Sequence, residues 1–193
     1  MIKDIFKSPV SYNYLKHLNN KKISSYCLKI KTLDTGHVIS NSGGYQSHDL
    51  QGSHTLLNEL FNDIEHFASQ MADTIGLKSP MLLNNAWINV NGYKDFNTQH
   101  IHPHSVLSGT YYAKTPKQCG NIVFHHPGYD LLVYDWNSRN LKDDNSTYTA
   151  GRWNMPAEAG KLIIFPSWLK HFVEPNLNKK EERISISFNL LPK

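Results

Sequence analysis

Three histidines occupy alternate positions in the segment Gln99-His100-Ile101-His102-Pro103-His104. In an extended backbone, alternate side chains point to the same face, so the three imidazoles could be presented together. A neutral imidazole offers one nitrogen lone pair, which makes such a row a candidate site for a transition metal. A short His-x-His pair also occurs by chance in polar loops, so a metal site needs a further ligand from elsewhere in the chain.

A histidine and an arginine far downstream could complete such a site. His171 follows an apolar run and a proline turn, and Arg183 opens a stretch in which apolar residues alternate with serines, the first being Ser185. A guanidinium at a strand end is costly to bury unless an anion meets it, and a carboxylate matches its planar shape. An exposed ion pair between the arginine and Glu181 or Glu182 is the structural alternative.

The elements that must position these residues are short and rich in β-branched or aromatic side chains, with turn signals between them. They span residues 86–90, 106–113, 121–125, 152–155, 161–165, 171–174 and 183–190. Many short strands without intervening helices predict an antiparallel sandwich or barrel. The polar stretch 137–150 predicts a long surface loop.

The first 80 residues predict supporting elements. Apolar residues between 54 and 75 form one helical stripe, with Ser53 as the expected N-cap and Gly76 as the terminator, so we expect a helix that buttresses a sheet. Residues 1–20 carry a weak helical pattern, and residues 26–31 alternate as a strand does. The chain is therefore expected to form a single domain over 1–193, with 1–80 as support and 81–193 as the core.

Composition and charge narrow the class of protein. The chain has 193 residues, of which 39% are hydrophobic and 19% charged, as in an ordinary soluble globular protein. Cys27 and Cys119 make no disulfide framework, no signal peptide is visible and no apolar run could span a bilayer, so we expect a cytoplasmic protein. The net charge of +4 comes from scattered lysines, a pattern that does not favour a nucleic-acid partner.

Five short motifs link these observations. They are Gly43-Gly44-Tyr45-Gln46-Ser47, His100-Ile101-His102-Pro103, Ser108-Gly109-Thr110-Tyr111-Tyr112, Phe165-Pro166-Ser167-Trp168-Leu169-Lys170-His171 and Arg183-Ile184-Ser185. With them the sequence resembles the iron(II)- and 2-oxoglutarate-dependent oxygenases, and among these a prolyl-4-hydroxylase-like subgroup found in phage and bacteria. The likeness covers about residues 41 to 190.

The resemblance implies a mainly β fold, a double-stranded β-helix or jelly roll, with iron(II) at its open mouth. The iron ligands that it implies are His100, His102 and His171. The residues that it implies for the distal carboxylate of the cosubstrate 2-oxoglutarate are Arg183, Ser185 and Tyr112. The activity would be that of a dioxygenase, which hydroxylates a C–H bond while 2-oxoglutarate and O2 become succinate and CO2. The substrate, a small molecule or a peptide, cannot be read from the sequence.

One position departs from the wider superfamily, which has Asp or Glu where this chain has His102. Asp95 or Glu174 could supply a carboxylate instead, and His102 with His104 could be the true pair, leaving His100 outside. Two other functions stay open. One is a three-histidine metal dioxygenase that needs no 2-oxoglutarate, and the other is a non-catalytic jelly-roll module that binds a sugar or a protein.

Residues that precede the first histidine could line the mouth of the site. We expect this of Trp87, Asn89, Asn91 and Gln99. Tyr45 and Gln46, in the glycine-rich motif, could form part of a lid over it.

Overall fold

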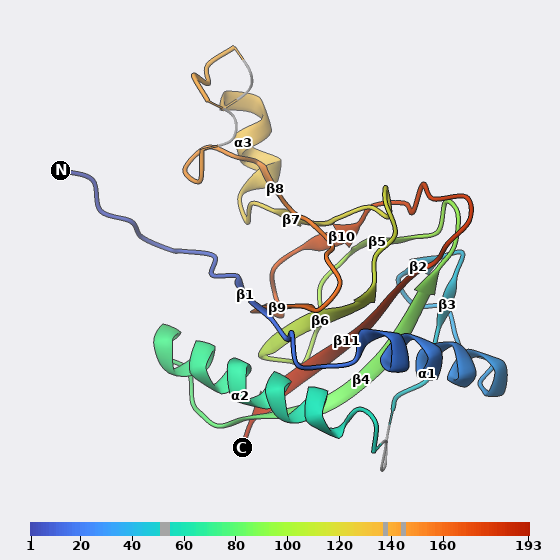
Figure 1. The fold of residues 1–193 in the computed structure, drawn as a ribbon. Coiled ribbons are helices and arrows are strands. Elements are labelled where there is room, and N and C mark those ends of the chain that lie inside the picture. Colours follow the sequence, from blue (N-terminus) through green and yellow to red (C-terminus); the bar gives the residue numbers. More distant parts are fainter. Residues whose placement is uncertain (51–54, 137–138, 144–145) are drawn as a thin grey trace.

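The computed structural model describes residues 1–50, 55–136, 139–143 and 146–193. Within them, two antiparallel sheets face one another, and two N-terminal helices cover the outer side of the larger sheet (Figure 1). This is the mainly β, double-stranded β-helix architecture that the sequence predicted, with supporting N-terminal helices. No helix of the described residues is both long and apolar enough to cross a membrane.

The larger sheet has, in spatial order, β1 (Ser11–Tyr14), β9 (Lys161–Pro166), β6 (Leu107–Lys114), β11 (Arg183–Pro192), β4 (Met81–Asn91) and β3 (Tyr45–Gln46). The smaller sheet has β2 (Asn41–Ser42), β5 (Phe96–His100), β10 (His171–Val173), β7 (Ile122–His125) and β8 (Arg152–Met155). The helices are α1 (Asn20–Leu33), α2 (Asn58–Ile75) and α3 (Tyr129–Asp135).

The two faces of the larger sheet have different chemistry because side chains alternate along each strand. On β4, Ala86, Ile88 and Val90 are almost fully buried and belong to the main core, which packs against α1 and α2. Their neighbours Trp87 and Asn89 line the space between the two sheets. The apolar face of the sheet thus stabilises the fold and the polar face is left for function.

The helix α2 agrees with its prediction. Leu60, Ile64 and Ala68 are buried against the sheet, at the spacing of one helical stripe. Gly76 ends the helix in the left-handed conformation, with φ 79°. The predicted N-cap Ser53 lies outside the described residues, and Leu57 precedes the first helical residue.

Two predictions in the first third of the chain were wrong. Residues 26–31 lie in α1 and form no strand. The apolar residues in this short window alternate, but they belong to a helical stripe that begins earlier, at Ile23, and continues through Tyr26, Cys27 and Ile30. The weak helical pattern in residues 1–20 belongs to β1, where Ser11 pairs with Ile164 of β9.

The short strands β2 and β3 were not predicted, and neither were β5 and α3. The strand β5 begins at Phe96 and is polar from Asn97 to His100, so it lacks the usual alternation. The helix α3 lies between β7 and β8, directly before the segment predicted as a surface loop. Residues 137, 138, 144 and 145 of that segment lie outside the described residues.

Candidate active site

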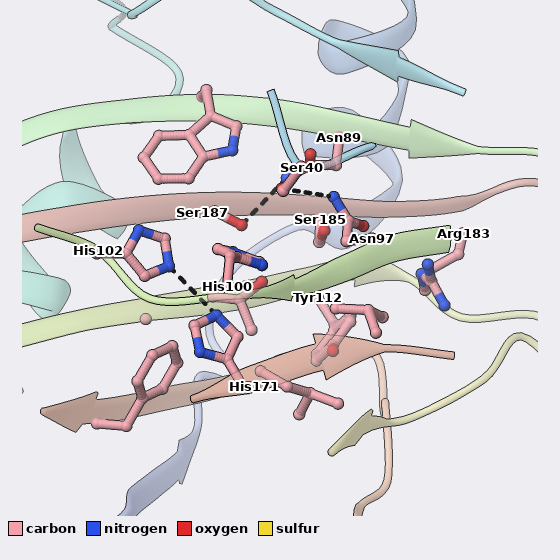
Figure 2. Close-up of a pocket in the computed structure, with 16 residues that line it drawn as sticks. Ser40, Asn89, Asn97, His100, His102, Tyr112, His171, Arg183, Ser185 and Ser187 are labelled. Carbon is pink, nitrogen blue, oxygen red and sulfur yellow. Dashed lines mark hydrogen bonds between the residues drawn. The ribbon is translucent and has the colours of Figure 1, made fainter. Parts of the chain in front are cut away.

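Pairing between two short strands brings the first and last of the predicted ligands together. His100 ends β5 and His171 begins β10, and the two are directly opposed in the antiparallel pair. Opposed residues point to the same face of a sheet, and the ring centroids lie 4.4 Å apart. His102 follows β5, with its amide N–H donating to the carbonyl oxygen of Ser167 at 2.9 Å. One ligand atom from each of the three rings lies within 4.8 Å of the others (Figure 2).

Hydrogen bonds orient two of these rings. Nδ1 of His100 lies 2.7 Å from the carbonyl oxygen of Thr98, and Nδ1 of His171 lies 2.8 Å from that of Leu169. A carbonyl oxygen only accepts, so each Nδ1 carries the proton and each Nε2 keeps its lone pair.

The spacing of the nitrogens suits one metal ion. Nε2 of His102 lies 3.2 Å from Nε2 of His171. Two imidazole nitrogens at about 2.1 Å from one ion, and at right angles, would lie about 3 Å apart. The His102–His171 pair therefore has the spacing of two ligands of one divalent transition metal.

Burial keeps the three imidazoles neutral, as ligation requires. Burial lowers the pKa of His100. Burial and the neighbouring His100 lower the pKa of His102 to about 3. The pKa of His171 lies well below its ordinary value because of burial and of the other two rings.

The alternative ligands lie elsewhere. His104 has a positive φ of 64°, its side chain is exposed, and it does not join the group of three. Asp95 accepts a hydrogen bond from the amide of Gly92 at 2.7 Å, and Glu174 accepts one from Asn121 at 2.9 Å. Within the described residues, neither carboxylate lies in the histidine group.

Arg183 is buried and forms no ion pair with any carboxylate of the described residues. It opens β11 and is 1% exposed. Nη1 donates to the carbonyl oxygens of Glu174, at 2.9 Å, and of Cys119, whereas Nη2 has no hydrogen-bond partner in the described part of the chain. Glu181, considered above as a surface partner for Arg183, pairs instead with Lys114 at 3.2 Å. A buried guanidinium with a free N–H group calls for an anion.

Tyr112 presents a second buried donor near that guanidinium. Its hydroxyl has no partner among the described residues, and burial raises its pKa to about 12 although the charge of Arg183 opposes the shift. The hydroxyl therefore stays protonated. Ser185 is the cross-strand neighbour of Tyr112 in the β11–β6 pair. These residues and the three histidines line one pocket (Figure 2).

Other residues of the pocket were only partly foreseen. Trp87 and Asn89 line it as expected, Gln99 lines an adjoining groove, and Asn91 lines neither. Tyr45 and Gln46 lie on the edge strand β3, hydrogen-bonded to β4. Further lining residues were missed, namely Ser40, Asn97, Thr110 and Ser187. Two of them, Thr110 and Ser187, could have been found from the alternation of polar and apolar residues along β6 and β11.

The sequence also matches a protein-family model. The model described as "Putative 2OG-Fe(II) oxygenase" matches residues 85–189, which is more than half of the chain. The chain therefore belongs to the 2OG-Fe(II) oxygenase family, the enzymes that use iron(II) as cofactor and 2-oxoglutarate as cosubstrate. This confirms the class of enzyme and the cofactors that the resemblance implied. It sets aside both a dioxygenase without 2-oxoglutarate and a non-catalytic module.

Solved structures with the same fold share little sequence with this chain. A Pseudomonas putida prolyl-4-hydroxylase has 12% identity and a TM-score of 0.66, over 96% of this chain and 94% of that one. A viral collagen prolyl hydroxylase from Paramecium Bursaria Chlorella virus-1 has 12% identity and a TM-score of 0.62, over 95% and 96%. The epimerase SnoN from nogalamycin biosynthesis has 18% identity and a TM-score of 0.64, over 96% and 79%. Among curated proteins, none matches significantly.

Proposed function

We propose that His100, His102 and His171 hold the iron(II) of this oxygenase. The observation that carries the proposal is the convergence of their three ligand atoms within 4.8 Å, from strand segments far apart in the chain. Neutral rings and oriented Nε2 lone pairs support it, because protonated imidazoles cannot bind a metal. Three neutral ligands leave the charge of the ion uncompensated until an anionic cosubstrate binds nearby.

We propose further that Arg183, Ser185 and Tyr112 bind the distal carboxylate of 2-oxoglutarate. The buried guanidinium has a free N–H group and the buried tyrosine has a free hydroxyl, and both line the same pocket as the histidines. A carboxylate accepts from both donors and neutralises the buried charge. The other end of the cosubstrate would then lie toward the histidines.

The reaction that we propose is hydroxylation of a substrate C–H bond. Iron(II) and 2-oxoglutarate together supply the oxidising chemistry, in which O2 and 2-oxoglutarate become succinate, CO2 and one hydroxyl group on the substrate. The chain itself anchors the cosubstrate, orients the ligand rings through backbone carbonyls and surrounds the site with two sheets that limit access of water.

The substrate that we propose is a small molecule or a peptide. The fold neighbours include prolyl hydroxylases and an epimerase, so this architecture serves more than one outcome. We propose that 1–193 acts as one oxygenase domain, with 81–193 as its core, and that it works in the cytoplasm. The two free, buried thiols of Cys27 and Cys119 are compatible with a reducing compartment.

Anaerobic spectroscopy tests the metal and cosubstrate sites without turnover. Adding iron(II) and then 2-oxoglutarate to the wild-type protein should produce a weak visible charge-transfer band. His171→Ala should abolish the band, whereas His66→Ala, which removes an exposed histidine on α2, should leave it unchanged. A wild-type protein without the band, or an unchanged band in the His171 variant, would contradict the proposal.

A further inference from the structure

A second hollow adjoins the three histidines. Its lining includes Gln46 of β3, Asn85 and Trp87 of β4, and both His100 and His102. The two histidines and Trp87 also line the pocket described above, so the hollow leads directly to the proposed iron. We call this hollow the amide groove, for the carboxamides on its walls.

Carboxamides with unpartnered oxygens stand on one face of β3 and β4. Gln46 is 4% exposed and Asn89 is 5% exposed, and these two residues are cross-strand neighbours. Asn85 lies on the same face of β4, four residues before Asn89. The side-chain oxygens of all three have no hydrogen-bond partner among the described residues. Gln46 and Asn85 line the groove, and Asn89 lines the adjoining pocket of the histidines. Buried polar atoms are nearly always paired, so these oxygens indicate that a ligand carrying donors belongs here.

The charges around the groove exclude one large class of ligand. Asp49 is the one carboxylate among the described residues of its lining, and that lining contains no lysine or arginine. Apart from the proposed iron itself, a phosphate or carboxylate would therefore meet acceptor oxygens and no fixed positive charge of the chain. The part of the substrate that occupies the groove is expected to be uncharged.

From this geometry we propose that the amide groove recognises its substrate through an uncharged amide group, a primary carboxamide or a peptide-type amide, held by Gln46 and Asn85. A carboxamide can present either its oxygen or its NH2 group by turning about its last bond, and an amide ligand carries the complement of both. Trp87 offers an apolar surface for the rest of the substrate. This inference rests on the proposed function, because it places the amide next to the iron.

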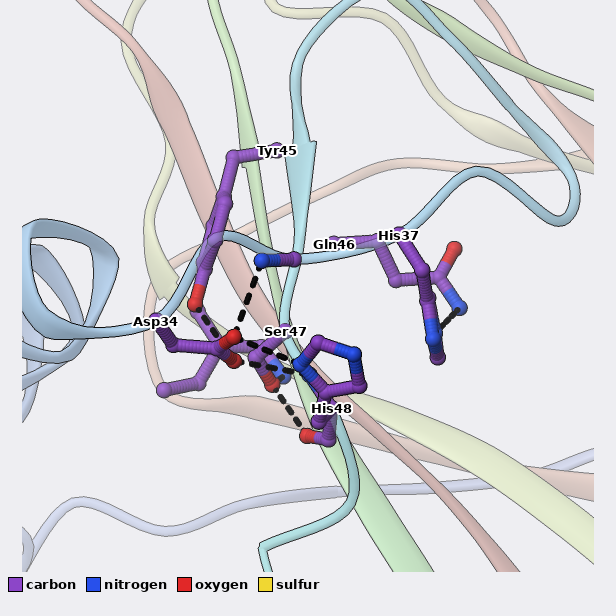
Figure 3. Close-up of polar contacts among 8 residues, drawn as sticks. Asp34, His37, Tyr45, Gln46, Ser47 and His48 are labelled. Carbon is purple, nitrogen blue, oxygen red and sulfur yellow. Dashed lines mark hydrogen bonds and ion pairs between the residues drawn. The ribbon is translucent and has the colours of Figure 1, made fainter.

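The structure holds Gln46 firmly enough to select a ligand. Its backbone carbonyl oxygen accepts from the amide of His37 at 3.0 Å, and its Nε2 lies 3.4 Å from Nε2 of the same histidine. The adjacent Tyr45 and His48 are fixed by Asp34, whose carboxylate contacts the tyrosine hydroxyl at 3.1 Å and His48 Nδ1 at 2.6 Å (Figure 3). The free oxygen of Gln46 is thus presented by an ordered strand.

The proposal is tested by comparing the binding of benzamide and benzoate. The two molecules are alike except that benzamide carries a carboxamide where benzoate carries a carboxylate. Ligand-observed NMR would measure both in protein supplied with zinc(II) and 2-oxoglutarate, so that no turnover occurs. We expect benzamide to bind at least about tenfold more tightly than benzoate. Gln46→Leu and Asn85→Leu should each weaken benzamide about fivefold, the factor that corresponds to one hydrogen bond of about 1 kcal/mol. The matched control Gln70→Leu, on α2, should change nothing.

Replacing the neutral Gln46 with a carboxylate should create a new ligand preference, and a misfolded variant would not show one. Gln46→Glu should shift the preference from benzamide to the planar cation benzamidine, and Gln70→Glu should not. The inference is overturned if benzamide does not bind, or if benzoate or benzamidine binds the wild type as tightly as benzamide does. It is also overturned if the Gln46 and Asn85 variants keep the wild-type preference. A charge-transfer band without an amide preference would overturn this inference alone. An amide preference without the band would overturn the proposed iron site.

Discussion

The Nε2 atoms of His102 and His171 lie 3.2 Å apart, although 69 positions separate the two residues in the chain. Two nitrogen lone pairs at that distance repel one another unless a proton or a cation lies between them. A neutral imidazole ring carries one proton, and in His171 this proton is on Nδ1, which donates to the carbonyl oxygen of Leu169. Without an ion, the Nε2–H of His102 donates to Nε2 of His171, and a bound ion would take the place of that proton.

The choice between His102 and His104 can be tested by removing each in turn. His102→Ala should weaken iron(II) binding by at least about tenfold, because even loss of an outer-shell partner costs that much. His104→Ala should have no effect, since this side chain is exposed and does not belong to the group of three. Competition with a coloured chelator under anaerobic conditions measures both. The reverse order of effects would restore the His102–His104 pair as the ligands.

Replacing His102 with aspartate should produce the two-histidine, one-carboxylate ligand set of other non-haem iron oxygenases. The added negative charge offsets that of the ion, so His102→Asp is expected to bind iron(II) more tightly than the wild type when 2-oxoglutarate is absent. The measurement is a metal titration with and without 2-oxoglutarate. Weaker binding in both titrations would contradict the placement of this side chain at the metal.

Arg183 and Tyr112 should control the affinity for 2-oxoglutarate. Loss of a buried charged partner costs roughly 2–5 kcal/mol, so Arg183→Ala should raise the half-saturating 2-oxoglutarate concentration about thirtyfold or more. Tyr112→Phe should raise it about fivefold, as expected for one hydrogen bond. The charge-transfer band provides the titration signal.

Tyr111→Phe is the matched control for Tyr112→Phe. The Tyr111 hydroxyl donates to Asn20 at the start of α1, on the other face of the sheet. Its removal should lower the melting temperature and leave the 2-oxoglutarate titration unchanged. A larger effect from Tyr111 than from Tyr112 would reverse the assignment of this tyrosine pair.

The carboxylate of Asp34 should make stability depend on pH in acid. Burial alone raises the pKa of this carboxyl, but hydrogen bonds from Gly36, His48 and Tyr45 hold it well below its ordinary value of 3.8. A carboxyl whose pKa is lower in the folded state stabilises the protein above its unfolded pKa, and this contribution is lost as pH falls. The wild-type melting temperature should therefore fall steeply below about pH 5, and Asp34→Asn should fall less.

At neutral pH the same substitution should cost about 1–2 kcal/mol, the lower part of the range for charged hydrogen bonds, because the side chain is 21% exposed. That corresponds to a decrease of about 2–8 °C in melting temperature for a chain of this size. Asp73→Asn, at an exposed position of α2, is the control and should change neither value. Equal acid sensitivity of the wild type and Asp34→Asn would refute this role.

Gly109 should tolerate no side chain. A Cβ at this position of β6 would meet the backbone oxygen of Ile163 and the ring of Phe188, both in the packed core. Gly109→Ala should therefore destabilise the protein by about 1–3 kcal/mol through overpacking. Gly128→Ala, whose new Cβ would have its nearest neighbour at 3.5 Å, should be close to neutral. Urea unfolding of the two variants separates these outcomes.

The core strands were predictable from sequence because each shows a local pattern that its packing requires. Residues 122–124 and 162–166 are apolar runs, as is expected of strands buried on both sides. The strand β11 alternates because only one of its faces meets the helices. The wrong predictions fell where such a pattern was short or absent. Tyr26 to Lys31 is too short a window to separate a helix from a strand.

The candidate site was predictable only in part. The histidines and Arg183 were found because of their residue types and the motifs around them, but the pairing of His100 with His171 depends on sheet register, which no local pattern encodes. Gln46 was named from the sequence only as a possible part of a lid, because its place beside Asn89 depends on the pairing of two strands.

The alternation along β4 also suggests how this protein could be altered. The side chains at positions 85, 87 and 89 line the pocket of the histidines or the amide groove, whereas Ala86 and Ile88 pack in the hydrophobic core. A library restricted to the odd positions should yield new selectivities at little cost in stability. A single inserted residue would exchange the two faces and abolish both properties together.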